Sequence, residues 1–184
     1  MKTDTFQIDG PVLFSPRRFE DARGYFMETF RRSVFDDSVG EPVEFVQDNQ
    51  SLSRRKGTVR GLHYQSPPHA QGKLVRCIQG AIVDIAVDVR RGSATYGQHV
   101  RAELTQDNAR QLWVPPGFLH GFSTLTDDVV VHYKCSDYYA AGAEGSVVWN
   151  DPDLSIDWGV DAVDAVVSQK DAAAPAFDAF QSPF

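Results

Sequence analysis

The chain has 184 residues, of which 42% are hydrophobic, enough for one sizeable core and too few for two ordinary domains, so residues 1–184 are expected to form a single domain. A formal net charge of −7 argues against nucleic acid or an anionic membrane surface as the main partner, because both attract basic proteins. No stretch approaches 18 apolar residues and the N-terminus lacks a signal-peptide core, so a cytoplasmic location is expected.

Short β-strands are predicted by two-residue alternation of apolar side chains, interrupted by turn residues. In chain order the predicted strands are 12–14, 26–30, 44–52, 58–62, 73–78, 81–89, 99–104, 111–114, 121–125 and 129–135. The clearest is 81–89, where the odd positions are apolar and Asp84 and Asp88 occupy the other face. Helical patterns are weak and occur only near residues 31–39 and after Asp161.

Many short strands between turns predict an all-β fold, an antiparallel sandwich or jelly-roll barrel with a few short helices. Twelve Phe, six Tyr and three Trp favour a rigid aromatic core, and Trp113, Trp149 and Trp158 are expected to pack. Cys77 and Cys135 lie in strand-like runs and are expected to be buried free thiols. Because a small barrel can hold one small ligand, polar residues on inward faces become site candidates.

The segment 57–65 places Arg60 and His63 in a strand-like run. Strict alternation puts these two side chains on opposite faces, so they can serve one pocket only if a bulge or a strand end intervenes. Taken alone, a histidine in such a run is more often a hydrogen-bonded structural residue than a catalytic one.

A metal site is a second interpretation, because small barrels with a Pro-Gly-x-x-His turn, here residues 116–120, often bind iron, manganese or zinc. No second histidine lies two residues after His63, and the next ionic group after His69 is the cation Lys73. Since cations repel a metal ion, no metal and no cofactor are expected.

The remaining polar side chains suit acid/base chemistry at a carbon next to a ketone. Such an epimerisation needs a base, a donor that holds the enolate oxygen, and an acid on the opposite face. His63 is the natural base because imidazole titrates near neutrality, and a carboxylate on its second nitrogen would fix its tautomer. Lys73 can hold the enolate, and Tyr133 can be either the opposing acid or an ordinary core tyrosine.

Motifs along nearly the whole chain resemble those of a known family. In order, they are Phe19-x-Asp21-x-Arg23-Gly24-x-Phe26-x-Glu28, Gln47-Asp48-Asn49-x-Ser51, Arg60-Gly61-Leu62-His63-Tyr64-Gln65, Lys73-Leu74-Val75, Gly92-Ser93-x-Thr95-Tyr96-Gly97, Trp113-Val114-Pro115-Pro116-Gly117-Phe118-x-His120-Gly121-Phe122, Tyr133-Lys134-Cys135, Tyr138-Tyr139, Trp149-Asn150-Asp151-Pro152 and Ser168-x-Lys170-Asp171. Together they resemble the dTDP-4-dehydrorhamnose 3,5-epimerases. The resemblance implies a cupin-like jelly roll, a homodimer and a cofactor-independent isomerase.

The resemblance also implies roles for individual residues. It makes His63 the base, Asp171 its orienting carboxylate, Tyr133 the acid and Lys73 the residue beside the sugar oxygens. The implied substrate-binding residues fall into three groups. The diphosphate is held by Arg60, His120 and Lys170; the nucleoside is met by Gln47, Asn49 and a tyrosine of the pair Tyr138-Tyr139, with Tyr139 favoured for stacking; and the partner subunit supplies Arg23, Phe26 and Glu28. Asp48 and Glu144 are further substrate contacts.

The function implied by this resemblance is epimerisation at C3 and C5 of dTDP-4-dehydro-6-deoxy-D-glucose, a step toward dTDP-L-rhamnose for cell-envelope polysaccharide. An epimerase that inverts only C3 or only C5 of a related dTDP-4-keto sugar would use the same residues. From other classes, a sugar-nucleotide binding protein and a metal-dependent cupin oxygenase remain alternatives. Neither the pathway's end product nor the source organism follows from the sequence.

Overall fold

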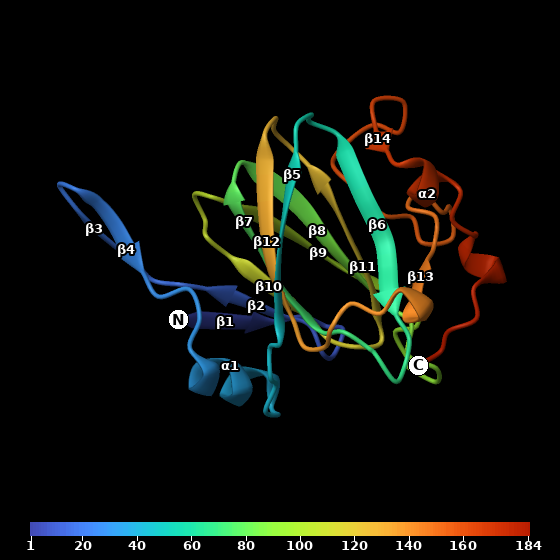
Figure 1. The fold of residues 1–184 in the computed structure, drawn as a ribbon, viewed down its shortest axis with the longest axis horizontal. Helices are drawn as coiled ribbons and strands as arrows, with labels where there is room; N and C mark the ends of the chain where they lie inside the picture. The colour runs from blue at the N-terminus through green and yellow to red at the C-terminus, as the bar shows by residue number, and fades with distance from the viewer.

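Two antiparallel sheets lie face to face in the computed structural model, which describes residues 1–184 (Figure 1). The first sheet has the order β1-β2-β10-β7-β12-β5. Its strands are β1 Lys2–Thr5, β2 Val12–Ser15, β10 Gln111–Val114, β7 Lys73–Gln79, β12 Val129–Cys135 and β5 Gln47–Ser53. The second sheet has the order β13-β6-β11-β8-β9, with β14 parallel to β6. Its strands are β13 Glu144–Ser146, β6 Thr58–Gln65, β11 Phe118–Thr124, β8 Ala81–Asp88, β9 His99–Thr105 and β14 Val166–Val167.

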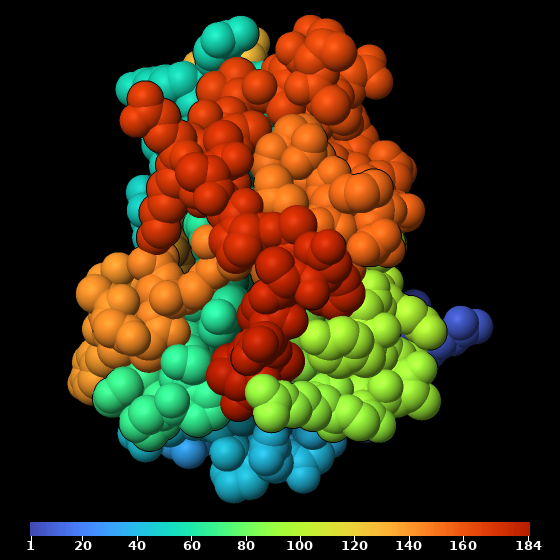
Figure 2. Space-filling model, turned by 90° about the vertical axis from the view of Figure 1, so that its right-hand side faces the viewer, coloured from blue at the N-terminus to red at the C-terminus, as the bar shows by residue number.

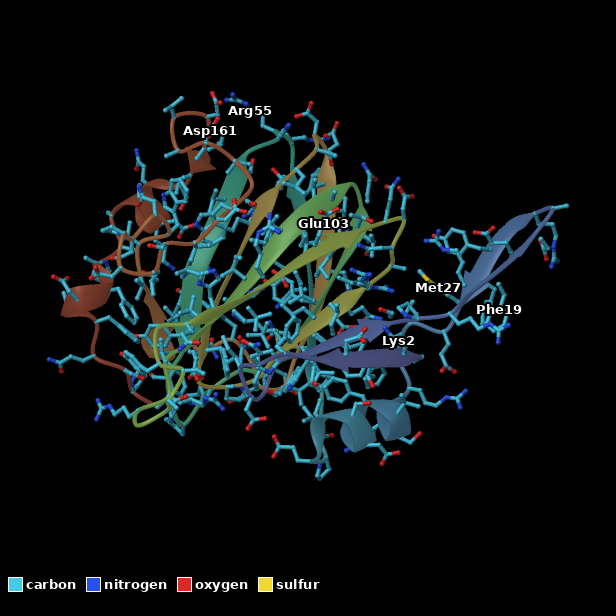
Figure 3. All side chains as sticks on the ribbon, turned by 180° about the vertical axis from the view of Figure 1, so that it is seen from behind. Lys2, Phe19, Met27, Arg55, Glu103 and Asp161 are labelled. Atoms are coloured by element: carbon cyan, nitrogen blue, oxygen red, sulfur yellow. The ribbon has the colours of Figure 1, made fainter.

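A hairpin of β3 Arg18–Asp21 and β4 Gly24–Met27 projects away from both sheets, as Figure 1 and the reverse view in Figure 3 show. Helix α1 (Arg32–Val39) follows it and buries Phe35 against Trp113 of β10. The other helical segments are short: η1 Ala141–Ala143, α2 Gln169–Ala172 and η2 Phe177–Ala179. No helix of the chain is both long and apolar enough to cross a membrane.

The predicted all-β class, with jelly-roll sheets and a few short helices, is confirmed. Every predicted strand run contains a strand, although the run 26–30 was placed wrongly, because its strand ends at Met27 and belongs to the projecting hairpin. Strands β1, β3, β13 and β14 were missed, since they are short and mostly exposed or carry no alternation. The three tryptophans and both cysteines are buried, as expected.

Strand β8 is buried on both faces, and this decides which of its residues face the interior. Ile82 and Ala86 belong to the core between the sheets, whereas Val83, Ile85 and Val87 belong to a second core on the outer side. The alternation therefore sets Asp84 on the interior face.

The second core is closed by the C-terminal segment, residues 147–184. Figure 2 shows this segment, in orange and red, running over one side of the molecule. Trp149 and Trp158 pack from it onto the outer face of the second sheet. The backbone N–H of Val148 donates to Pro175, and the N–H of Phe177 donates to the Asp151 carboxylate at 2.7 Å. An apolar outer face that would otherwise meet water is thus removed from it, which stabilises the segment in place.

Candidate active site

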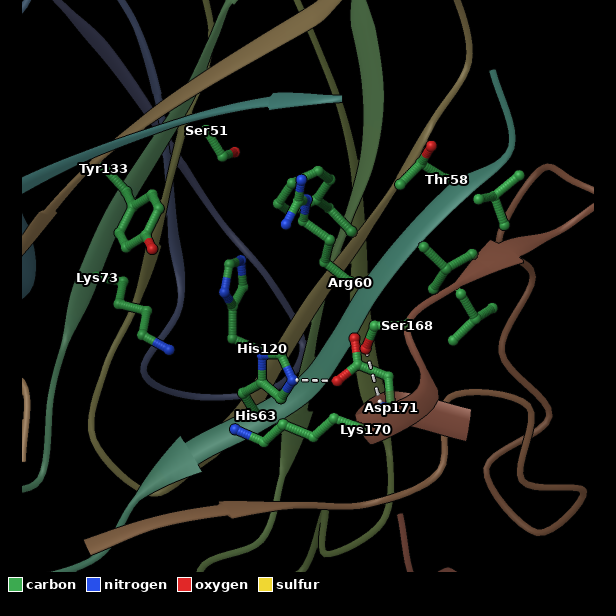
Figure 4. A pocket seen from close by; sticks show the side chains of 14 residues that line it. Ser51, Thr58, Arg60, His63, Lys73, His120, Tyr133, Ser168, Lys170 and Asp171 are labelled. Atoms are coloured by element: carbon green, nitrogen blue, oxygen red, sulfur yellow. Dashed lines mark hydrogen bonds and ion pairs between the residues drawn. The ribbon is translucent and has the colours of Figure 1, made fainter. Parts of the chain in front are cut away.

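Two connected cavities lie at the open edge of the sandwich, between β5 and β12 of one sheet and β6 of the other. The first has a volume of about 460 Å³ and the second about 430 Å³. His63, Lys73 and Tyr133 line both, so these three side chains stand where the cavities meet. Figure 4 shows the first cavity from close by.

A bulge in β6 brings Arg60 and His63 to the same cavity. His63 pairs with His120, and Arg60 pairs with Phe122. Three residue steps along β6 therefore lie opposite two residue steps along β11, which is a β-bulge. Gly61 occupies the bulge with φ +108°, and a Cβ there would lie 2.6 Å from the carbonyl oxygen of His120. Only glycine fits this position. The bulge that the sequence required for a shared pocket is therefore present.

His63 is held by a carboxylate from the far end of the chain. Its Nε2 lies 2.7 Å from Oδ1 of Asp171, and Oδ2 of Asp171 accepts from the Gly61 N–H at 3.2 Å. The Ser168 hydroxyl caps α2 by accepting from the N–H of Asp171. With Nε2 donating to the carboxylate, Nδ1 carries the lone pair. Burial lowers the pKa of His63 below its ordinary value, although Asp171 opposes this shift. The imidazole is therefore neutral at neutral pH and can accept a proton.

Lys73 and Tyr133 stand on the opposite wall. They come from β7 and β12 of the first sheet, whereas His63 comes from β6 of the second (Figure 4). Burial lowers the pKa of Lys73, and the nearby Cys135, Asp84 and Glu144 work against that shift. Burial raises the pKa of Tyr133, so its hydroxyl keeps its proton at neutral pH. A phenolic proton donor and a lysine amine thus face a neutral base across the cavity.

The three basic residues that the resemblance assigns to the diphosphate all line the first cavity. Arg60 donates from Nε to the Ser53 hydroxyl at 3.1 Å. Lys170 lies 2.6 Å from a Glu144 carboxylate oxygen, and His120 pairs with a buried aspartate. These hydrogen bonds and ion pairs hold the three basic side chains in place in the wall of the cavity.

Most of the implied nucleoside contacts line the second cavity. Gln47 donates to Asn49 at 3.1 Å and accepts from the backbone N–H of Tyr139 at 3.0 Å. The Tyr139 hydroxyl donates to Glu144 at 3.0 Å. Tyr138 lines neither cavity, so the structure favours Tyr139 of the pair for a stacking role.

Asp48 lies apart from the other predicted substrate-binding residues, and its predicted contact with the substrate stays a prediction. Alternation along β5 turns its side chain to the opposite face from Gln47 and Asn49, and its carboxylate accepts from Lys134 at 3.0 Å on the outer surface of the sheet. It lines neither of the two site cavities.

Three further predicted residues, Arg23, Phe26 and Glu28, lie outside the cavities of their own chain. Arg23 pairs with Asp21 at 2.6 Å and Glu28 with Arg31 at 2.7 Å. Phe26, on the projecting hairpin, is 71% exposed. Their predicted contact with a partner subunit's site stays a prediction.

Sequence reasoning missed two residues of the site. Ser51 lines the first cavity with a hydroxyl that is sealed from solvent and has no hydrogen-bond partner. Asp84 lines neither cavity, but its Oδ1 lies 2.8 Å from Nε2 of His120, which does. A charged residue on the interior face of an apolar strand was the signal for Asp84, but the sequence alone does not show which face of β8 is the interior one.

The site can remove a proton from a carbon acid on one side and return it on the other. His63 with Asp171 supplies the base, and Tyr133 supplies an acid on the facing wall. Lys73 can stabilise the negative oxygen that forms between them. No three histidine, cysteine, aspartate or glutamate side chains are grouped as metal ligands.

Known proteins are similar to this chain in both sequence and fold. The profile of the dTDP-4-dehydrorhamnose 3,5-epimerase family matches residues 5–179. The chain is 53% identical to a dTDP-4-dehydrorhamnose 3,5-epimerase of Sinorhizobium fredii over 89% of this chain and 83% of that one. It is 47% identical to that of Pseudomonas aeruginosa over 96% of each. Its fold is similar to a dTDP-6-deoxy-D-glucose-3,5-epimerase of Legionella pneumophila solved with dTDP-4-keto-L-rhamnose, with TM-score 0.92, 42% identity, and coverage of 98% and 94% of the two chains.

Proposed function

The chain belongs to the dTDP-4-dehydrorhamnose 3,5-epimerase family, and we propose that this isomerase inverts C3 and C5 of dTDP-4-dehydro-6-deoxy-D-glucose. The product is dTDP-4-dehydro-L-rhamnose, the 4-keto precursor of dTDP-L-rhamnose. The observation that carries the proposal is the placement of a neutral, carboxylate-held His63 across one cavity from Tyr133 and Lys73.

The reaction begins at a carbon next to the C4 ketone. Nδ1 of His63 takes the proton from that carbon, and the electron pair moves onto O4 to give an enolate. The ammonium group of Lys73 stabilises the negative oxygen. Tyr133 then gives its phenolic proton to the same carbon from the opposite face, which inverts the centre.

Both centres flank the same carbonyl, so one enolate-stabilising group can serve each in turn. The ring must present C3 and then C5 to His63, while Tyr133 stays on the other wall. The nucleotide keeps the sugar in place during this change. Arg60, His120 and Lys170 hold the diphosphate, and Gln47, Asn49 and Tyr139 meet the nucleoside, with Glu144 beside them.

We also propose that the enzyme is a cytoplasmic homodimer. The projecting hairpin supports a dimer, because its aromatic side chains Phe19, Tyr25 and Phe26 are half or more exposed in the single chain. In the dimer, Arg23, Phe26 and Glu28 would reach the nucleotide bound to the partner subunit. Mass measurement in solution tests the dimer, with a hairpin variant as its control.

The function is tested by proton NMR of dTDP-4-dehydro-6-deoxy-D-glucose in deuterated water with chelator-treated protein, beside a His63→Ala control. Deuterium at both C3 and C5, absent with the control, is the expected result. Exchange at one carbon only would replace the proposal by a single-centre epimerase, and no exchange would refute epimerisation of this substrate.

A Tyr133→Phe variant tests the acid. Because proton removal does not need the acid, C–H exchange is expected to continue while product formation falls. Unchanged product yield would contradict the role of Tyr133.

A further inference from the structure

Asp84 is a fully buried carboxylate at the floor of the site. It lies on β8, and 0% of it is exposed. One oxygen lies 2.8 Å from Nε2 of His120, and the other has no hydrogen-bond partner. An uncompensated buried charge strongly destabilises a fold, because it has lost its hydration and gained no partner. Such a group is expected to have a positive partner.

The surroundings of Asp84 offer two positive partners and no other. Lys73 and Cys77 approach from β7, His120 from β11, and the register partner on β9 is the uncharged Ala102. Burial raises the pKa of the Cys77 thiol to about 11, so it adds no charge at neutral pH. Asp84 raises the pKa of Lys73 against the effect of burial.

Building on the proposed function, we propose that Asp84 is a positioning residue: it is the buried counter-charge that holds His120 as an imidazolium aimed at the bound sugar nucleotide. His120 lines the first cavity beside His63, and Nε2 is occupied by Asp84. A neutral imidazole that donates from Nε2 has only a lone pair at Nδ1 and cannot donate to an oxygen. An imidazolium donates from both nitrogens.

This assignment gives His120 a chemical task. Its Nδ1–H is a charged donor for a negative oxygen of the ligand, either a diphosphate oxygen or the enolate O4. Asp84 also acts on Lys73 through space and opposes the lowering of its pKa by burial. One carboxylate outside the cavity thereby favours the protonated form of two basic side chains that line it.

The charge of His120 can be measured in the native enzyme, and a variant is needed only to assign the signal. Nitrogen-15 histidine labelling with NMR at pH 7 reports the protonation of each ring nitrogen, and a His120→Gln sample assigns the signal. Protons on both ring nitrogens of His120, and on only one ring nitrogen of His63, are the expected result. An unprotonated ring nitrogen in His120 would overturn the proposal, whether or not the enzyme acts on the proposed substrate.

An Asp84→Asn variant tests the consequence for the reaction, with Asp88→Asn as its matched control. Asp88 lies on the same strand and is equally buried, but its carboxylate accepts from Arg90, Ser93 and Thr95 away from the cavity. Loss of Asp84 is expected to lower kcat/KM by about tenfold to a hundredfold, the usual effect of removing a partner that orients an active-site group. The alkaline limb of the pH profile should move to lower pH, because Lys73 loses an anion that raises its pKa.

The control separates a structural role from a positioning one. Asp88→Asn is expected to lower the melting temperature while leaving the pH profile of the folded enzyme in place. If Asp84→Asn and Asp88→Asn change stability alike and neither moves the profile, Asp84 is a structural residue and the proposal is wrong. If native enzyme produces no exchange in either carbon, the proposed function fails instead, and the ring-nitrogen measurement still decides the charge of His120.

Discussion

The site contains two histidine–carboxylate pairs with nearly the same N···O distance. They differ in exposure to solvent and in the hydrogen bonds that the carboxylate accepts. His63 lies 2.7 Å from Asp171, and His120 lies 2.8 Å from Asp84. The His63 side chain is 30% exposed and its carboxylate has both oxygens bonded, one by the Gly61 N–H. The second pair is buried, and one carboxylate oxygen is unbonded.

The difference shows that the distance within such a pair does not define its role. A carboxylate whose charge is spread over two hydrogen bonds can leave an imidazole neutral, which suits a base. A carboxylate that is sealed from water with a single partner favours a charged partner, which suits a donor. The predictions below test whether the two pairs are as different as this argument requires.

The largest expected difference lies between the two imidazoles. His63→Ala should reduce deuterium incorporation by about a thousandfold or more, within the range for loss of a general base. His120→Gln should reduce it by only about tenfold to a hundredfold, since the base remains. Proton NMR in deuterated water measures both, and equal losses would show that the pairs share one role.

Removing the charge from the first pair should have the next largest effect. Asp171→Asn keeps the size of the side chain and takes away the anion that selects the tautomer of His63, so kcat/KM should fall about a hundredfold. Steady-state kinetics measures this, and circular dichroism checks that the fold is kept. A loss below threefold would mean that Gly61 and packing alone orient the base.

The pH profile should carry the signature of the neutral base. Because burial lowers the pKa of His63, its neutral form persists as the pH falls through its ordinary value, and activity is lost only below that. The acid limb of kcat/KM is therefore expected below pH 6.5, the ordinary pKa of histidine, and the alkaline limb from Lys73 below pH 10.5, the ordinary pKa of lysine. An acid limb above pH 7 would contradict a depressed pKa at His63.

The smallest effect is expected at the helix cap that carries Asp171. Ser168→Ala removes the hydroxyl that accepts from the Asp171 N–H, which should cost about 1 kcal/mol of unfolding free energy. Activity should fall only a few-fold, because α2 still docks. Thermal unfolding measures the change against Ser38→Ala, whose hydroxyl donates to Val34 in α1 and is remote from the site.

Much of this architecture could be predicted from the sequence, for a physical reason. Period-two alternation reports burial directly, so the strands 81–89 and 129–135 were predicted nearly to the residue. The need for a bulge between Arg60 and His63 also followed from alternation, and the glycine in that interval supplies it.

Long-range pairing and facing could not be obtained in this way. Asp171 lies 108 residues after His63, and only the resemblance to a family joined the two. The inward face of β8 depends on the C-terminal segment, which covers the more apolar side and leaves Asp84 inside. Asp48 was assigned to the site because it belongs to the same motif as Gln47 and Asn49. Alternation along the strand places its side chain on the opposite face of the sheet from theirs.

The docking of the C-terminal segment has a consequence for how the enzyme could be divided. Val163, 91% exposed, lies in the loop that joins the sandwich to the stretch holding Asp171. Beyond that loop, the stretch is fastened by its own contacts, among them Val148 to Pro175 and Arg91 to Phe184. A single cut beside Val163 would therefore leave His63, the proposed base, on one fragment and Asp171, its carboxylate partner, on the other. Catalysis would then report whether the two fragments had associated, as in a split reporter enzyme.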